Sequence, residues 1–202
     1  MRGGRVLEIL TGAGLAIAAG MNAYVPLLAL GVADRFIGAV DLPAAWQWLS
    51  NEWVLGVLGL LLVVEIVADK IPLVDSVNDW LQTIIRPTSG GIVFGSGVAS
   101  ETVAVTDPAE FFSSDRWVPI AIGAGLALTV HVVKALARPA LNTLTAGAAA
   151  PVMSTLEDIG SVLLTLAAIV LPILVIAGVV FVVVAGLFVV RRVRRTRRPT
   201  PV

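Results

Sequence analysis

The most constraining feature of this sequence is an uninterrupted apolar run near its C-terminal end. Residues 159–190 are 32 consecutive positions without a charged side chain. As one α-helix the run would be about 48 Å long, which exceeds the roughly 30 Å hydrocarbon core of a bilayer. The run therefore tilts, kinks at Pro172 or folds into two short spans. The composition agrees with a membrane protein, because only 14% of the 202 residues are charged, against about a quarter in soluble domains.

Further apolar stretches predict an all-α fold, a polytopic transmembrane helical bundle of about five to six spans in a single domain over residues 1–190. Lys and Arg residues that flank a span are usually retained in the cytoplasm. Their positions in this sequence place both chain ends inside, which requires an even number of spans and favours six. The expected spans are 6–33, 53–72, 88–105, 117–137, 157–172 and 173–190.

A short sequence repeat within the chain has two interpretations. GAGLAI at 12–17 recurs as GAGLAL at 123–128, and three expected spans separate the two copies. An odd number of spans would make the halves a 3+3 inverted repeat, as in many secondary transporters. The alternative is close helix packing through small residues, which recur in any packed membrane helix.

Three segments differ from ordinary lipid-facing spans. Residues 73–86 place apolar and polar side chains on opposite faces, which predicts an amphipathic helix that lies on the membrane or covers the bundle. Residues 88–97 are rich in glycine and residues 139–151 in alanine, so both are candidates for broken elements. The tail at 191–202 carries six arginines and is expected to bind anionic lipid headgroups on the cytoplasmic side.

Ionisable residues at bilayer depth are the candidate functional residues, since each costs at least about 2.5 to 3.5 kcal/mol to insert. They fall into two groups at helical spacing, Glu65, Asp69 and Lys70 on the second span and His131, Lys134 and Arg138 on the fourth. The two groups lie at similar depth, so they either neutralise each other as structural ion pairs or line a polar cavity open to the cytoplasm. In the second case Glu65, about 18 Å along its span, is the expected proton or cation site.

Two further places carry polar groups near the spans. Asn22, Tyr24 and Pro26 interrupt the first span, and Pro26 deprives the Asn22 carbonyl of its helical donor, which makes Asn22 a candidate for binding a ligand or a neighbouring helix. Glu157 follows Ser154 by three residues, a capping-box pattern that predicts the start of the fifth span at this point.

Several segments have a recognisable pattern: NAYVPLLALG (22–31), WLSNEWVLGVLG (48–59), EIVADKIPLVDSVNDWLQTIIRP (65–87), HVVKALARP (131–139) and PVMSTLEDIGSVLLTLAAIVLP (151–172). With these segments the chain resembles the DUF4126 family of small bacterial inner-membrane proteins. The resemblance implies a multi-span protein of the bacterial inner membrane and assigns no substrate, reaction or cofactor.

The sequence argues against an enzyme, since it has one histidine, no cysteine, no nucleotide-binding glycine loop and no HExxH motif. No cofactor, structural metal or nucleic-acid partner is expected. The residues favour a small transporter or channel-like protein for an ion, a solute or a lipid, which could form a homo-oligomer. The alternatives are a non-transporting scaffold with paired structural charges, and a carrier of polyprenyl-phosphate lipids held by the basic group on the fourth span.

Overall fold

The computed structural model describes residues 2–38, 40–98, 115, 117–145, 148–176, 180 and 184. These residues form helices and connecting turns without any strand, which confirms the all-α fold class. The elements are α1 (Arg2–Met21), α2 (Tyr24–Val32), the π-helical turn η1 (Ala33–Ile37), the 3-10 helix η2 (Ala44–Ser50), α3 (Glu52–Ala68), α4 (Pro72–Val98), α6 (Trp117–Thr145) and α7 (Ala149–Val170).

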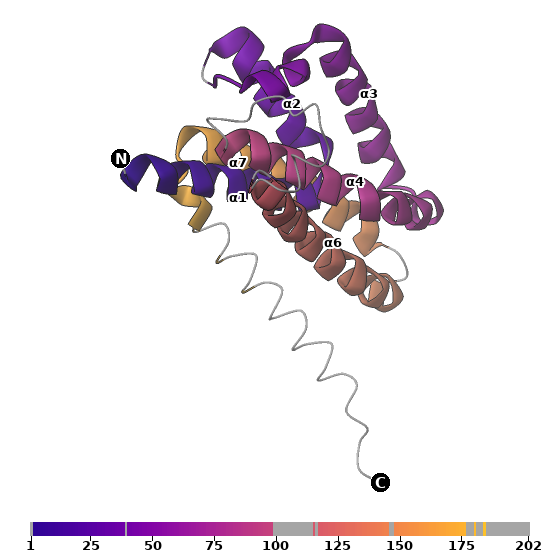
Figure 1. The fold of residues 1–202 in the computed structure, drawn as a ribbon. Helices are drawn as coiled ribbons and strands as arrows, with labels where there is room; N and C mark the ends of the chain where they lie inside the picture. The colour runs from indigo at the N-terminus through magenta and orange to yellow at the C-terminus, as the bar shows by residue number, and fades with distance from the viewer. Residues whose placement is uncertain are drawn as a thin grey trace.

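Helices α1, α4 and α6 form the centre of the bundle, and α7 packs against α1 (Figure 1). Every residue from Leu15 to Ala19 is at most 5% exposed, so α1 is buried on all its faces at this level. Glycines allow the close approach of these helices, because a Cβ on Gly90 of α4 would lie 2.7 Å from the carbonyl oxygen of Gly123 on α6. Both GAGLA segments therefore lie on helices that pack closely, which is one of the two roles left open by the sequence.

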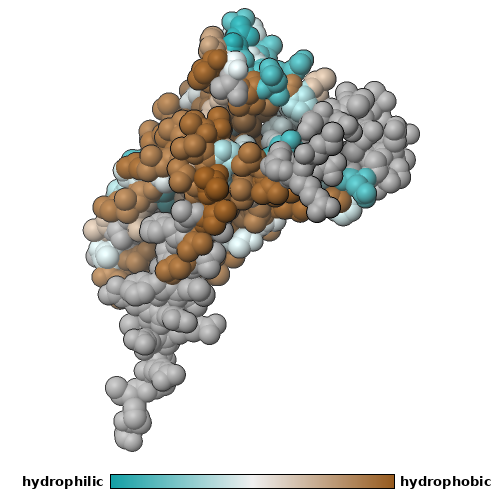
Figure 2. All heavy atoms as spheres, turned by 90° about the vertical axis from the view of Figure 1, so that its left-hand side faces the viewer, coloured by the Kyte–Doolittle hydropathy of each residue, from teal (hydrophilic) through white to brown (hydrophobic). Residues whose placement is uncertain are grey.

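The outer surface is strongly apolar. In α3 only Leu58, Glu65 and Ala68 are buried among the described residues, and Trp53 and Leu60 are 81% and 65% exposed. Figure 1 shows α3 standing away from the central helices, and Figure 2 shows an extensive hydrophobic face below a hydrophilic end, where η1 and η2 lie. Apolar surface of this extent is expected where lipid surrounds a protein.

Two helices in the described part of the chain are long and apolar enough to cross a membrane, at Trp117–Pro139 and Ala150–Val170. A third candidate is the pair formed by η2 and α3, which are bent by 63° relative to each other. The expectation of six spans therefore stays a prediction. Most of the expected span at 173–190 and the whole basic tail at 191–202 lie outside the described residues.

The interruption expected in the stretch 6–33 is present, since two helices meet at a break at Asn22 and Ala23. The helix boundaries at two prolines differ from those expected, because α4 runs unbroken through Pro87 and α6 through Pro139. The expected boundary between residues 73–86 and 88–105 is therefore wrong, and the glycine-rich segment 88–97 is helical. A membrane helix tolerates an internal proline where its neighbours hold it in place, and contacts with Gly20 at the end of α1 and with Ala23 after it hold α4 on both sides of Pro87.

Candidate functional site: a buried charged cluster

Ionisable side chains from four parts of the chain meet inside the bundle. We call them the charged cluster: Glu65 of α3, Asp69 just after α3, Asp79 and Arg86 of α4, His131, Lys134 and Arg138 of α6, and Glu157 of α7. Six of these eight residues, all except Asp79 and Glu157, are at most 8% exposed. The acidic and basic groups expected on separate spans are therefore in direct contact.

Asp69 is the common partner of the cations. Its Oδ2 lies 3.4 Å from Nζ of Lys134, 3.7 Å from Nη2 of Arg86 and 3.9 Å from Nη2 of Arg138. Its other oxygen, Oδ1, accepts a hydrogen bond of 2.7 Å from the Asn78 side chain. Three positive charges around one buried carboxylate keep it ionised and tie the end of α3 to α4 and α6.

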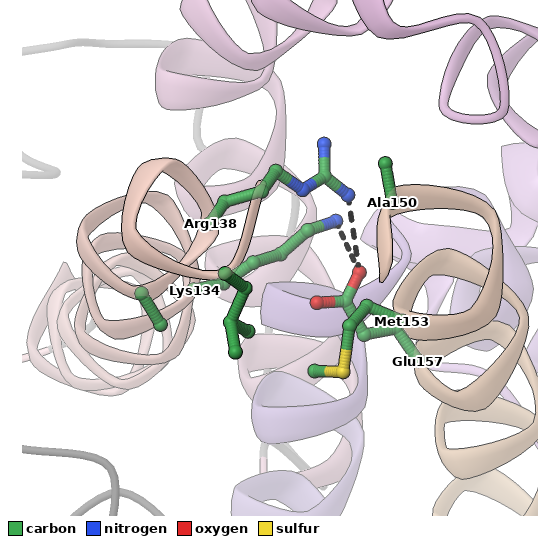
Figure 3. A pocket seen from close by; sticks show the side chains of 7 residues that line it. Lys134, Arg138, Ala150, Met153 and Glu157 are labelled. Carbon is green, nitrogen blue, oxygen red and sulfur yellow. Dashed lines mark hydrogen bonds and ion pairs between the residues drawn. The ribbon is translucent and has the colours of Figure 1, made fainter. Parts of the chain in front are cut away.

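Glu157 neutralises the other side of the same two α6 cations. Its Oε2 lies 2.7 Å from Nζ of Lys134 and 3.4 Å from Nη2 of Arg138, as Figure 3 shows. The sequence prediction that Glu157 begins a helix is wrong, because α7 begins at Ala149. Pro151 is compatible with this earlier start because it falls in the first turn of α7, where a missing N–H breaks no intrahelical hydrogen bond. Glu157 is therefore a mid-helix residue whose role is ion pairing.

Sequence reasoning missed the two members of the charged cluster on α4, Asp79 and Arg86. Arg86 is fully buried, and its Nη2 donates to Oε1 of Glu65 over 2.9 Å while Nη1 donates to the carbonyl oxygen of Gly20 over 3.1 Å. A third contact of 3.5 Å joins Nη1 to Nδ1 of His131. Arg86 therefore connects α3, α6 and the end of α1.

The reason for this omission is the orientation of the first half of α4. A helix that lies on the membrane would turn its polar side toward water or headgroups, but Gln82 is 1% exposed whereas Val77 and Trp80 are 65% and 71% exposed. The polar face points into the bundle and the apolar face points outward. The spacing of Asp79, Gln82 and Arg86 places them on one face of the helix. This spacing identifies Arg86 as a buried residue if the polar faces of helices in an apolar protein are expected to turn inward.

His131 is held in one neutral form by its neighbours. Arginine can only donate, so Nδ1 of His131 accepts from Arg86, and Nε2 then carries the proton. Nε2 lies 3.1 Å from Oγ1 of Thr83, whose hydroxyl donates to the backbone carbonyl of Asp79. His131 therefore adds a hydrogen-bonding group to the charged cluster and no net charge.

The break between α1 and α2 lies directly beside the charged cluster. Oδ1 of Asn22 accepts from the backbone N–H groups of Tyr24 and Val25, at 3.1 and 3.2 Å, and so caps the start of α2. Its amide nitrogen donates to Asp158 over 3.0 Å. The Gly20 carbonyl oxygen, whose helical donor would be the Tyr24 N–H that Asn22 binds, accepts instead from Arg86, and the Ala23 carbonyl oxygen accepts from Ser89.

Lys70 lies at the margin of the charged cluster. Its side chain is 38% exposed and pairs with Asp158 over 3.6 Å, and its Nζ also donates to the carbonyl oxygen of Ile66. All seven residues singled out from the sequence therefore gather in one region, either within the charged cluster or at its edge: Asn22, Glu65, Asp69, Lys70, His131, Lys134 and Arg138.

Two oxygens of the charged cluster, Oε2 of Glu65 and Oδ1 of Asp79, have no hydrogen-bond donor among the described residues, and neither has Oε1 of Gln82 on α4. A cavity of about 30 Å³ lies against Lys134, Arg138 and Glu157 (Figure 3). This volume has room for about two water molecules. In the described part of the chain, no group of three or more His, Cys, Asp or Glu residues could hold a metal ion.

Comparison with known proteins places this architecture in a family. The model of the domain of unknown function DUF4126 matches residues 9–192, a range that includes every residue of the charged cluster. No curated protein and no solved structure matches the chain. Because the match covers most of the chain, the protein belongs to the DUF4126 family.

Proposed function

We propose that this protein is a small membrane transporter whose substrate path passes the break between α1 and α2 at the charged cluster. One observation carries the proposal: Arg86 donates both to the carbonyl oxygen of Gly20, at the break, and to the carboxylate of Glu65. Broken helices with free backbone groups beside ionisable side chains are the elements from which secondary transporters build their binding sites.

The free-energy cost of the charged cluster also favours transport over a purely structural role. A bundle that only has to keep its shape can fill its interior with apolar side chains, because replacing a buried ion pair in this way is often neutral or stabilising. The described residues of this chain instead include six ionisable side chains at 8% exposure or less. Ionisable residues in such positions usually mark ion or substrate pathways.

The described conformation corresponds to a closed state of such a transporter. Each charged member of the charged cluster has an oppositely charged neighbour, and the cavity beside Lys134 holds only about two waters. Opening requires the ion pair between Lys134 and Glu157 to separate, which would part α6 from α7. A lipid carrier is less well supported, because this cavity is too small for a phosphate headgroup and Glu157 already neutralises the basic residues.

The proposal includes an orientation. We place the protein in the bacterial inner membrane with both ends in the cytoplasm, because the tail at 191–202 carries six arginines and basic flanks are retained on that side. A reporter fused to each end, with activity only in the cytoplasm, measures this orientation. Activity at one end alone would contradict it.

A test of transport is available without knowing the substrate. The chain has no cysteine, so a single introduced thiol reports its own access to water. Ser89→Cys places the thiol at the break, and Thr165→Cys is the matched control, since both residues are 1% exposed. A water-soluble thiol reagent applied to membrane vesicles is expected to modify the first variant and not the second.

The same measurement separates the transporter from the scaffold. If both thiols stay protected in membranes and react only after unfolding in detergent, the charged cluster never opens to water, and the protein is a scaffold with structural ion pairs. Modification of both thiols at one rate would indicate general loosening of the bundle and would also count against a path at the break.

A further inference from the structure

The charged cluster contains one more carboxylate than cations. Arg86, Lys134 and Arg138 supply three positive charges, and the four carboxylates are those of Glu65, Asp69, Asp79 and Glu157. His131 is neutral, and Lys70 and Asp158 at the margin cancel each other. Among the residues that the structure describes, three minus four leaves a formal charge of −1 in the charged cluster. An uncompensated buried charge is costly, and binding a proton removes it.

Glu65 is the carboxylate best placed to take this proton. Its side chain is 1% exposed, whereas the side chains of Asp79 and Glu157 are 18% and 15% exposed. Asp69 has three cations around it, but Glu65 has one close partner, Arg86, on Oε1. The other oxygen, Oε2, is buried and has no donor among the described residues.

The surroundings of Glu65 favour a proton over a metal cation. The guanidinium of Arg86 lies 2.9 Å from one oxygen and would repel any cation bound at this carboxylate. Sodium or calcium would also need several more oxygen ligands in a defined shell. The other ionisable groups facing Glu65 are Asp69 at the end of its own helix, Lys134 from α6 and Tyr24 from α2.

We propose that Glu65 binds the proton that drives transport, and that Arg86 passes this event to the break between α1 and α2. This inference rests on the transport function proposed above. The carboxylate takes one proton from water on one side of the membrane and later releases it to water on the other. Arg86 is a positioning residue here, because it acts through its contacts with Glu65 and Gly20.

The coupling follows from the partners of Arg86. When Glu65 becomes neutral, Nη2 of Arg86 loses its charged acceptor at 2.9 Å and keeps only Asp69, at 3.7 Å. A shift of the guanidinium toward Asp69 weakens the hydrogen bond from Nη1 to the Gly20 carbonyl. The Gly20 carbonyl lies in the last turn of α1. A proton bound by Glu65 on α3 therefore loosens the break through Arg86, although Glu65 itself makes no contact with the break.

Infrared spectroscopy of the protein in lipid membranes tests the proton site independently of transport. Acidification is expected to produce a carboxylic-acid carbonyl band that shifts when glutamate is labelled with carbon-13. The band should be lost in Glu65→Gln and kept in Glu52→Gln, which changes the exposed glutamate at the other end of α3. Absence of the band in the native protein, or its persistence in Glu65→Gln, would overturn the proposal.

A second variant keeps the test decisive if Glu65→Gln fails to fold. Arg86→Lys retains the positive charge but loses the forked donor that reaches both Glu65 and Gly20, so the labelled band should appear at higher pH than in the native protein. An unchanged band position and onset would overturn the inference. If the band is present while the thiol of Ser89→Cys stays protected, the proton site at Glu65 stands and the transport function is contradicted. If the thiol is modified but the band is absent, the transport function stands and the proton site is contradicted.

Discussion

Nη2 of Arg86 lies 2.9 Å from Oε1 of Glu65, and neither side chain is more than 1% exposed. This contact joins α4 to α3, a helix that otherwise buries only Leu58 and Ala68 among its described residues. The pair therefore combines two roles. It anchors a helix whose remaining surface is largely apolar and exposed, and it connects the buried carboxylate to the break between α1 and α2.

Removing one partner of this pair should be strongly destabilising. Arg86→Gln leaves the Glu65 carboxylate buried without its counter-charge, and the expected loss is about 3 to 5 kcal/mol of unfolding free energy. Equilibrium unfolding of the purified protein in mixed micelles measures the loss. The double variant Glu65→Gln with Arg86→Gln should recover part of the stability, because no unpaired charge remains. A simple sum of the two single losses would contradict this interpretation of the contact.

The burial of an aspartate and its partners should determine how much the aspartate contributes to the free energy of unfolding. Asp69→Asn removes the charge that faces three buried cations, so we expect a loss of about 3 to 5 kcal/mol. Asp158→Asn is the comparison, since its partner Lys70 is 38% exposed, and we expect a change of at most about 1 kcal/mol. The same unfolding measurement applies. Equal losses in the two variants would mean that water reaches Asp69.

Replacing a glycine by alanine should lower stability only where two helices are in close contact at that glycine. A Cβ on Gly90 would lie 2.7 Å from the carbonyl oxygen of Gly123, so Gly90→Ala forces α4 and α6 apart and should cost about 1 to 3 kcal/mol. Gly125 on α6 has no described atom within 4 Å of its Cβ position, and Gly125→Ala should leave stability unchanged or raise it by up to about 1 kcal/mol. Thermal unfolding in one detergent compares them, and similar values would refute this packing.

The break between α1 and α2 should be functionally distinct from an ordinary helix start. Asn22→Ala removes the cap of α2 and the contact with Asp158, and Asn51→Ala removes the similar cap of α3, where Asn51 accepts from Trp53. Each should cost about 0.5 to 2 kcal/mol. Only Asn22→Ala is expected to change the rate at which the thiol of Ser89→Cys is modified in membranes. Equal effects of the two variants on that rate would remove the special role of Asn22.

Much of the candidate site could be predicted from the sequence, because charge is informative in an apolar chain. Residues such as Glu65 and Lys134 are conspicuous between apolar neighbours, and helical spacing places each on a defined face. The interruption at Asn22 was also visible, since Pro26 cannot donate to the carbonyl four residues earlier. The sequence does not show which cation pairs with Glu65, because its partner Arg86 lies on α4, beyond the turn that follows α3.

The errors have a common physical cause, which is tertiary contact. The sequence predicts a boundary between residues 73–86 and 88–105, but the contacts of Arg86 and Ser89 on either side of Pro87 hold α4 in one helix. The local pattern of Ser154 and Glu157 predicts a helix start, although Glu157 lies inside α7 and pairs with two cations on α6. Local patterns identify a residue that needs a partner, and only the packing of distant helices supplies that partner.

The most direct test of the account combines the two proposals in one labelling rate. Glu65→Gln imitates the protonated carboxyl, so in the Ser89→Cys background it should speed modification of the thiol in membranes. The loss of a charge-assisted hydrogen bond, about 1.5 to 3 kcal/mol, predicts an acceleration of about tenfold or more. Glu52→Gln in the same background should leave the rate unchanged. A rate that does not rise in Glu65→Gln, with the variant folded, would contradict the claim that Glu65 controls the break through Arg86.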